Sequence, residues 1–200
     1  MREARVAAVV LAAGSSSRMG RNKLLLDVGG ETLVRRAVRA AGGGGVAEVV
    51  VVLGQDERRV RAELQGLPCA PVVNADHAEG AGTSVRTGVR YVPADADALV
   101  VVLADMPFVT AEMIAELVAR YRATGAPLVV SHYGDVQAPP TLYDRALFGE
   151  LLATPGERCA KEVVGRHRQE AVVVEWPAAA LADIDVPADY ERVVATLARH

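Results

Sequence analysis

One stretch of the chain combines small residues with fixed positive charge. Residues 11–23 read Leu-Ala-Ala-Gly-Ser-Ser-Ser-Arg-Met-Gly-Arg-Asn-Lys. Glycine and serine keep such a loop slim, so its backbone amides can turn towards oxyanions, while Arg18 and Lys23 bring two cations to the same place. This composition predicts a cradle for a triphosphate. The residues we expect to contact the nucleotide here are Leu11, Ala12, Ala13, Gly14, Ser15, Arg18 and Lys23.

The spacing differs from that of a Walker loop. Five residues separate Gly14 from Gly20, and Lys23 comes three positions after the second glycine. Any one of these residues alone would suit an ordinary surface loop with solvated bases. The whole set directly after an apolar run favours phosphate binding.

Two aspartates are candidate ligands for a metal ion. Asp105 directly follows the apolar run 100–104. A carboxylate there would lose hydration, which is unfavourable unless a partner binds it. Magnesium held by one or two carboxylates and by substrate phosphates is the usual solution, although Asp105 alone could also cap a turn. Asp185 follows a short apolar stretch and precedes Pro187, which places it at a second strand end. Two carboxylates opposite a basic loop suit phosphoryl or nucleotidyl transfer.

A third polar stretch lies at residues 74–84. Its backbone and side-chain amides could read the edge of a nucleobase, and a helix that Thr83 or Ser84 caps would point its amino end inward. We interpret His77 as a turn residue. Hydrolysis by an activated serine has no support, because the sequence has no GxSxG elbow. The expected nucleotide contacts from this stretch are Asn74, Asp76, Gly82 and Ser84.

The composition excludes several classes of protein. The 200 residues are 51% hydrophobic but only 4% aromatic, and the net charge is -3, so disorder, collagen and a nucleic-acid-coating protein are poor interpretations. Cys69 and Cys159 form neither a disulfide framework nor a zinc spacing. The apolar run 6–13 is too short to cross a membrane. We therefore expect a cytoplasmic protein whose partners are neither nucleic acid nor membrane.

Alternating strand and helix patterns predict one α/β domain over residues 1–200, with a mostly parallel sheet between helices. Residues 133–138 are expected to be a turn or hairpin tip, and the glycines 42–45 a flexible connection. Strands are expected at 6–13, 47–53, 98–104, 128–131 and 171–175, with a short one ending at 72–73. Helices are expected at 31–41, 56–64, 83–91, 110–124, 144–153 and 158–165, and from Pro187.

The sequence LAAGSSSRMGRNKLLL at residues 11–26 resembles the signature of the MobA-like nucleotidyltransferases, and most closely the branch with molybdenum cofactor cytidylyltransferase. Further similarity follows in order at 74–84 with Gly88, at 103–107 and at 183–190. The resemblance implies a three-layer Rossmann-like (GT-A-like) nucleotidyltransferase fold. It implies that Arg18, Lys23 and Asp105 are catalytic and that Asp105 and Asp185 hold Mg²⁺.

The implied reaction transfers CMP from CTP to a phosphate-bearing acceptor and releases pyrophosphate. The implied acceptor is molybdopterin or the molybdenum cofactor, and a molybdoenzyme or its chaperone would receive the product. The Ala-Ala-Gly form at 12–14 favours CTP, because guanylyl-transferring members tend to have Ala-Gly-Gly and an aspartate where Asn22 stands. Glu157 and Cys159 depart from the GDxGA pattern of the family, in the region expected to face the acceptor.

Three alternatives stay open at this point. A sugar- or alcohol-phosphate nucleotidyltransferase would share the first loop. A guanylyltransferase acting on molybdenum cofactor would differ in its base contacts. A non-enzymatic nucleotide-binding protein that delivers a cofactor would keep the cradle and need neither carboxylate.

Overall fold

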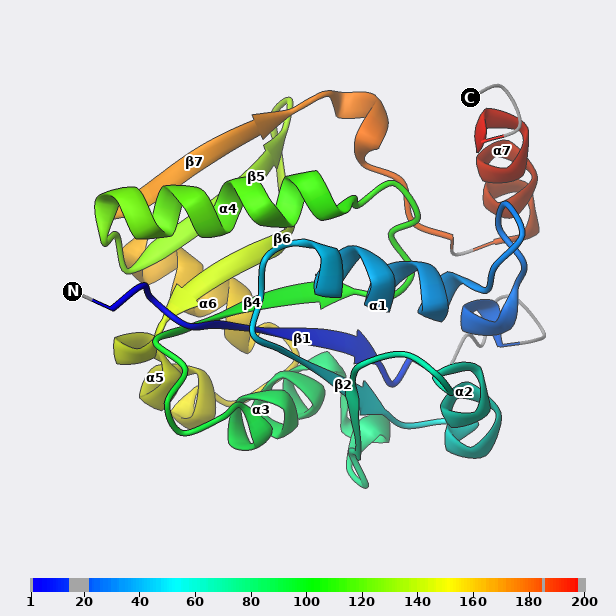
Figure 1. The fold of residues 1–200 in the computed structure, drawn as a ribbon, viewed down its shortest axis with the longest axis horizontal. Coiled ribbons are helices and arrows are strands. Elements are labelled where there is room, and N and C mark those ends of the chain that lie inside the picture. Colours follow the sequence, from blue (N-terminus) through cyan, green and yellow to red (C-terminus); the bar gives the residue numbers. More distant parts are fainter. Residues whose placement is uncertain (1, 15–21, 185, 198–200) are drawn as a thin grey trace.

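A seven-stranded sheet forms the centre of the computed structural model, which describes residues 2–14, 22–184 and 186–197 (Figure 1). The strand order is β3-β2-β1-β4-β6-β5-β7. All neighbouring strands are parallel except β6, which is antiparallel to both β4 and β5. The strands are β1 (Val6–Ala12), β2 (Glu48–Leu53), β3 (Ala70–Val73), β4 (Ala98–Leu103), β5 (Leu128–Tyr133), β6 (Val136–Asp144) and β7 (Ala171–Trp176).

Helices cover both faces of the sheet. Helices α1 (Leu33–Gly43) and α4 (Ala111–Thr124) lie on one face, and α3 (Ala81–Tyr91), α5 (Phe148–Ala153) and α6 (Cys159–His167) lie on the other (Figure 1). Helix α2 (Glu57–Glu63) follows β2, and α7 (Pro187–Leu197) ends the described chain. The expected three-layer α/β fold is thereby confirmed. Within the described residues, no helix has the length and apolar character needed to span a membrane.

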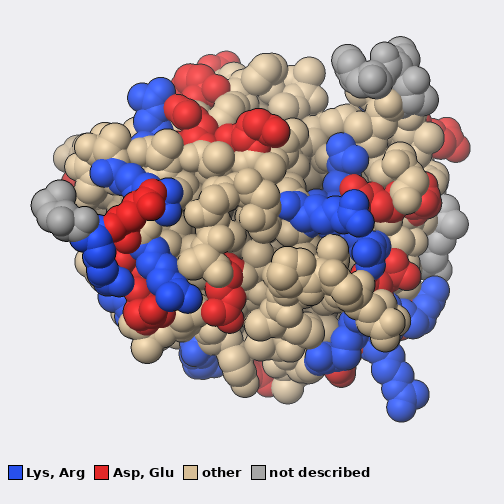
Figure 2. All heavy atoms as spheres, viewed as in Figure 1, with Lys and Arg blue, Asp and Glu red and all other residues tan. Residues whose placement is uncertain are grey.

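The central strands are buried on both sides, which explains their unbroken Val and Ala runs. Ala8 and Val10 of β1 join the cluster beneath α1 and α4, while Val9 joins the cluster beneath α3, α5 and α6. A third cluster joins Leu26 and Val28 to Ile184 and Val193, so the C-terminal segment packs beside the residues that precede α1. On the face seen in Figure 2, acidic and basic side chains are interspersed, in keeping with the near-balanced charge.

A hairpin tip does lie within residues 133–138, as predicted, but it is shorter than those bounds. The turn occupies Gly134 and Asp135, and β6 already begins at Val136. Two prolines within β6 concealed this strand, because proline cannot donate to a sheet ladder. The structure accommodates them with a register shift between Val130 and Ser131, where the Ser131 hydroxyl donates to the Pro140 carbonyl at 2.7 Å.

The glycines 42–45 are a packing contact rather than a flexible connection. Helix α1 runs through Gly43, and a Cβ on Gly44 would lie 2.3 Å from Cγ2 of Ile114 in α4. A Cβ on Gly43 would lie 2.9 Å from Cβ of Ala111. The two helices therefore approach closely because glycine leaves room, and that approach holds α4 against α1 over the sheet.

Candidate active site

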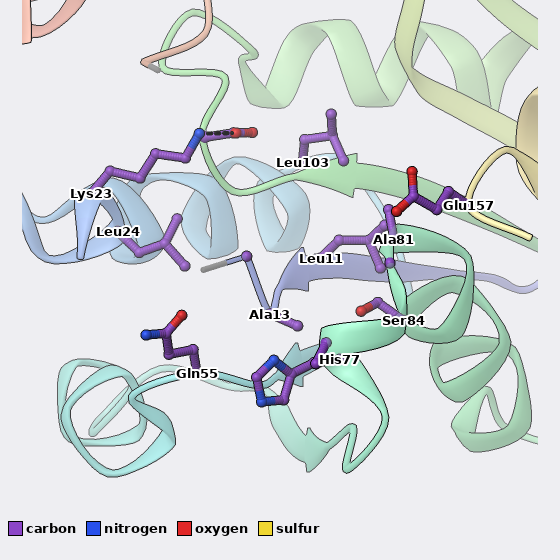
Figure 3. Close-up of a pocket in the computed structure, with 14 residues that line it drawn as sticks. Leu11, Ala13, Lys23, Leu24, Gln55, His77, Ala81, Ser84, Leu103 and Glu157 are labelled. Carbon is purple, nitrogen blue, oxygen red and sulfur yellow. Dashed lines mark ion pairs between the residues drawn. The ribbon is translucent and has the colours of Figure 1, made fainter. Parts of the chain in front are cut away.

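A cavity of about 610 Å³ opens at the carboxyl ends of the parallel strands (Figure 3). This is the edge of the sheet at which doubly wound α/β proteins bind ligands. Its floor comes from Leu11 of β1 and Leu103 of β4, and its walls come from the segments after β1, β2, β3 and β4. The cavity thus brings together six of the residues expected at the site, namely Leu11, Ala13, Gly14, Lys23, Ser84 and Asp105.

Lys23 and Asp105 form an ion pair at one end of this cavity. The distance from Lys23 Nζ to Asp105 Oδ2 is 2.7 Å, and the side chains are only 10% and 24% exposed. Lys23 begins a 3-10 helix (Lys23–Leu25). Asn22 caps this helix, because its Oδ1 accepts a hydrogen bond from the Leu24 amide at 3.0 Å. A largely buried charge pair of this geometry fixes both side chains strongly. A cation and a carboxylate therefore stand in contact where phosphates and a metal were expected.

Two contacts hold the backbone that carries Asp105. The Ile184 amide donates to the Asp105 carbonyl at 3.3 Å, and Arg36 Nε of α1 donates to the Pro107 carbonyl at 2.7 Å. Ile184, the residue before Asp185, is therefore hydrogen-bonded to Asp105. Asp105 and Asp185 are the two residues that were expected to share a metal ion. Ser15, Arg18 and Asp185 themselves lie outside the described residues. Among the residues that are described, no group of three or more His, Cys, Asp or Glu side chains could hold a metal ion.

Helix α3 begins earlier than the sequence suggested. Its N-cap is Gly80, with φ of 108°, and not Thr83 or Ser84. The Thr83 hydroxyl lies within hydrogen-bond distance of the carbonyls of Gly80 at 2.8 Å and Asp76 at 3.0 Å. The capping prediction was wrong because glycine supplies the positive φ at this corner, and the hydroxyls point back into the loop instead.

Asn74 is the centre of that loop. It is 2% exposed, and its Nδ2 donates to Thr83 Oγ1 at 2.8 Å and to Ser84 Oγ at 3.0 Å. Its Oδ1 accepts a hydrogen bond from the Asp76 amide at 3.1 Å. Both ends of the amide are engaged inside the protein, so Asn74 shapes the loop that follows β3. Direct contact of Asn74 or Asp76 with a nucleobase stays a prediction, since neither lines the cavity.

Ala12 and Gly82 also lie outside the cavity lining. A Cβ on Gly82 would come within 1.9 Å of the Gly156 carbonyl oxygen, so this glycine allows the segment between α5 and α6 to rest on the start of α3. That segment carries Glu157, whose Cγ would lie 2.3 Å from a Cβ on Gly80. Gly80 and Gly82 therefore leave room for Glu157 at the rim of the cavity, and Gly80 itself lines the cavity.

Gln55, His77 and Leu24 line the cavity although the sequence analysis did not place them at the site. Gln55 follows β2 directly, so the strand-end rule that found Asp105 could also have found it. Gly54 permits the close packing here, because its Cβ would lie 2.8 Å from Cβ of both Ala13 and His77. Gln55 and His77 thus face the cavity from the β2 and β3 side, away from the ion pair (Figure 3).

A second cavity of about 310 Å³ adjoins the first. The two share Leu11, Ala81, Leu103 and Glu157, so they form one cleft along the sheet edge. The second cavity has apolar walls and a basic rim, and β6 and α6 supply much of it. Its apolar lining includes Val85, Val101, Pro139 and Val164, and its charged or amide side chains are Gln137, Glu157, Arg158 and Lys161.

An ion-pair cluster joins α5 to α6 behind the Glu157 segment. His167 Nε2 lies 2.8 Å from Glu150 Oε1 and Nδ1 lies 3.2 Å from Glu170 Oε1, while Arg166 Nε donates to Glu150 at 3.0 Å. Hydrogen bonds to Glu150 and then Glu170 raise the pKa of His167. The hydrogen bond to His167 in turn lowers the pKa of Glu150. Arg166 also donates to the Thr154 hydroxyl at 2.9 Å, so the cluster fixes the start of the segment that carries Glu157.

This cluster predicts a pH dependence of stability. Because folding raises the pKa of His167, its contribution is complete below about pH 6.5 and disappears as the pH rises through the folded value. The contribution of Glu150, whose pKa is lowered, is complete above about pH 4.3 and disappears as the pH falls through the folded value. His167→Gln should therefore lower the free energy of unfolding most near about pH 5–6, by about 1 kcal/mol or less.

Urea unfolding of both proteins between pH 4 and 9 measures this difference. In a Glu150→Gln background, the effect of His167→Gln should lose most of its pH dependence. A destabilisation by His167→Gln that is equally large at about pH 8–9 would show that the ion pair is not its cause.

Comparisons with known proteins agree with this geometry. The family model for the MobA-like NTP transferase domain matches residues 8–172. The purine catabolism protein PucB of Bacillus subtilis is 32% identical over 96% of this chain and 98% of its own length. The bifunctional protein GlmU of Leifsonia xyli subsp. xyli is 33% identical over 92% of this chain, which spans only 39% of that relative.

The solved structures point to the same fold. The crystal structure of Rv0371c from Mycobacterium tuberculosis H37Rv has a TM-score of 0.85 and 27% identity, covering 97% of this chain and 100% of that one. A complex of the same protein with manganese has a TM-score of 0.80 and 26% identity, over 96% and 99% of the two chains. Both solved chains match this chain over nearly their full length and share its α/β architecture.

Proposed function

The chain belongs to the MobA-like NTP transferase domain family, and we propose that residues 1–200 act as one domain that transfers CMP from CTP to molybdopterin or the molybdenum cofactor. The observation that carries this proposal is the Lys23–Asp105 pair at one end of a cleft whose other end is apolar with a basic rim. The first cavity would hold the nucleotide and the second the acceptor. We propose that the reaction takes place in the cytoplasm and that a molybdoenzyme or its chaperone accepts the product.

The proposed step is an in-line displacement at the α-phosphorus. An oxygen of the acceptor phosphate forms the new bond to phosphorus, and the bond from phosphorus to the oxygen that bridges to the β-phosphate breaks. The electron pair of that bond leaves with pyrophosphate. The acceptor phosphate is already ionised at neutral pH and needs no general base, so the protein contributes orientation and charge. Lys23, and Arg18 from the first loop, neutralise the charge that builds up on the leaving pyrophosphate.

The donors at Asp105 fit a divalent cation. Its carboxylate is the hard oxygen ligand that Mg²⁺ prefers, and the backbone contact between Ile184 and Asp105 supports Asp185 as the second ligand. When bound there, Mg²⁺ would supply Lewis-acid polarisation of the phosphate oxygens. Asp105 and Asp185 would act on the triphosphate only through that ion, since carboxylates by themselves repel phosphate oxygens.

The preference for CTP rests on the first loop. The Ala-Ala-Gly form at 12–14 and Asn22 match cytidylyl-transferring members in the resemblance described above. The Asn22 Oδ1 accepts the hydrogen bond that caps the 3-10 helix presenting Lys23. Gln55 and His77 lie on the cavity side where the base would be, at a distance from the phosphate end (Figure 3). Both carry groups that donate and accept hydrogen bonds, as reading a cytosine edge requires.

The lining of the second cavity supports a flat acceptor that carries a phosphate. Val85, Val101, Pro139 and Val164 offer an apolar surface to a ring system, and Gln137, Thr141 and Tyr143 add polar groups to the same lining. Lys161 and the neighbouring Arg158 add positive charge for an anionic group. Molybdopterin combines a pterin ring system with a terminal phosphate and suits both features.

Lys161→Ala should therefore weaken acceptor binding without changing nucleotide binding. Loss of a charge-assisted contact should raise the KM for molybdopterin about 10-fold or more, with the KM for CTP unchanged. Steady-state pyrophosphate release measures both constants. Arg168→Ala is the matched control, because Arg168 is exposed at the end of α6 and lines neither cavity. An equal rise in the two KM values would argue against an acceptor site at this rim.

A pyrophosphate-release panel tests the function as a whole. CTP, GTP, ATP and UTP are each paired with molybdopterin, with several sugar phosphates and with alcohol phosphates. We expect release only with CTP and molybdopterin. Release with GTP and molybdopterin would identify a guanylyltransferase, and release only with sugar or alcohol phosphates would overturn the cofactor assignment. Nucleotide binding without any release would leave a cofactor-delivery protein.

A further inference from the structure

We propose that the carboxylate of Glu157 accepts hydrogen bonds from the 2′- and 3′-hydroxyls of the ribose, so that the protein selects ribonucleotides over deoxyribonucleotides. This inference rests on the proposed function, because it takes the first cavity as the nucleotide site. Glu157 lines both cavities and is the one charged side chain among the described residues that the two linings share. It therefore stands at the junction of the nucleotide and acceptor sites.

The segment that carries Glu157 is anchored at both ends. Thr154, at its start, is 7% exposed, and its carbonyl accepts a hydrogen bond from Arg86 Nη1 of α3 at 3.2 Å. Cys159, at its end, is fully buried where α6 begins. Gly156 between them has a φ of 84°, a left-handed conformation that glycine adopts without strain. The Glu157 side chain therefore extends from a backbone whose position is fixed by the packing of α3 against α6.

The carboxylate itself lies over the start of α3. Figure 3 shows the Glu157 side chain reaching towards Ala81, and a Cβ on Gly80 would lie 2.7 Å from Glu157 Oε1. Glycine at position 80 thus leaves the space that the carboxylate occupies. In the part of the chain that the structure describes, no hydrogen bond or ion pair engages this carboxylate. Both of its oxygens can therefore accept hydrogen bonds from a ligand in the cavity.

The other sides of the first cavity are assigned to other parts of the nucleotide. Lys23 lies on the side where we propose that the phosphates bind, and Gln55 and His77 lie on the side proposed for the base (Figure 3). Glu157 lies on a third side. Ribose joins the base to the α-phosphate, so it must occupy the corner between those two groups. A carboxylate also repels phosphate oxygens, which disfavours the triphosphate on the Glu157 side.

The ribose hydroxyls match the chemistry of a carboxylate. An ionised carboxylate only accepts hydrogen bonds, and the 2′- and 3′-hydroxyls are adjacent donors on one face of the sugar ring. In dinucleotide-binding folds an Asp or Glu side chain binds the ribose 2′-hydroxyl in this way. The 4-amino group of cytosine is a further donor, but it belongs to the base edge that faces Gln55 and His77. A ribose at Glu157 would also place the α-phosphate next to the junction through which the acceptor enters.

Calorimetric titration without acceptor tests the inference apart from turnover. CTP, 2′-deoxy-CTP and 3′-deoxy-CTP are each titrated with Mg²⁺ into wild type, Glu157→Ala and Glu157→Gln. Wild type should bind each deoxynucleotide about 10-fold more weakly than CTP, because a hydrogen bond to a charged acceptor is lost. Glu157→Ala should bind all three within about 3-fold of one another, and Glu157→Gln, which keeps one acceptor oxygen, should lie between. Glu162→Gln removes a neighbouring exposed carboxylate that lines neither cavity and should discriminate like wild type.

Equal discrimination by wild type and Glu157→Ala would overturn the inference, as would a wild type that binds CTP and both deoxynucleotides equally. A change only in the preference for CTP over UTP would assign Glu157 to the base instead, and a change only in the KM for the acceptor would assign it to the acceptor. Glu157 is exposed, so the variants should fold, and circular dichroism establishes that they do. Failure of the proposed function shows instead as absence of pyrophosphate release from wild type, so the two failures are distinguishable.

Discussion

Asp105→Asn will lower the rate of pyrophosphate release about 10³-fold while the protein stays folded. Asparagine keeps the shape of the side chain and one oxygen, but it removes the negative charge that Lys23 now compensates and that a metal ion would need. Because a cation held by this carboxylate would stabilise the α-phosphate mainly in the transition state, kcat should fall far more than the KM for CTP rises. Single-turnover pyrophosphate release with saturating CTP and acceptor measures this change.

Stability must be measured beside this rate. Asparagine leaves the Lys23 ammonium without its carboxylate, which should lower the free energy of unfolding by about 1–3 kcal/mol. The Lys23→Met/Asp105→Asn double variant removes both charges and should recover part of that loss without recovering activity. Asp135→Asn, in the exposed turn between β5 and β6, is the control for loss of one negative charge. Near-normal turnover by folded Asp105→Asn would show that Asp105 is neither a catalytic residue nor a metal ligand.

Lys23→Met will lower kcat/KM for CTP about 10²-fold or more. Lys23 is only 8% exposed and lines the end of the first cavity where we propose that the phosphates bind, so solvent ions should compensate poorly for its loss. Lys23→Arg should recover only part of the rate, because the planar guanidinium cannot occupy the same narrow position beside Asp105. Steady-state kinetics with CTP varied at saturating acceptor measure both variants.

A matched comparison separates this effect from a general loss of positive charge. Lys161→Met removes a lysine from the rim of the second cavity and should change the KM for the acceptor rather than that for CTP. A Lys23→Met protein that keeps wild-type kcat/KM for CTP would show that the first cavity does not bind the triphosphate through this residue.

Local sequence patterns correctly predicted the central strands and the residues that follow their carboxyl ends. The Val-rich runs predicted β1, β2 and β4, and the rule that ligands bind at the carboxyl ends of parallel strands placed Leu11, Lys23 and Asp105 around one cavity. The direct contact of Lys23 with Asp105 could not be predicted, because the two residues are far apart in sequence and their distance depends on how the chain packs.

Features that depend on long-range packing were missed. Strand β6 contains two prolines and becomes a strand only because β4 and β5 pair with it on both sides. Gly43 and Gly44 have the composition of a linker, yet the close approach of α4 makes them a contact. The second cavity depends on both β6 and α6, so the sequence pointed to this region only through Glu157 and Cys159, and Cys159 is buried and lines neither cavity.

The fate of each phosphorus atom of CTP distinguishes the proposed transfer from other uses of the same cleft. CTP labelled with ³²P at either the α or the γ position is incubated with the protein, Mg²⁺ and molybdopterin, and the products are separated. We predict that the α label moves to the molybdopterin product in equal amount to the pyrophosphate released, and that the γ label appears only in pyrophosphate. A γ label on the acceptor, or an α label that stays on free CMP or CTP, would contradict nucleotidyl transfer by this protein.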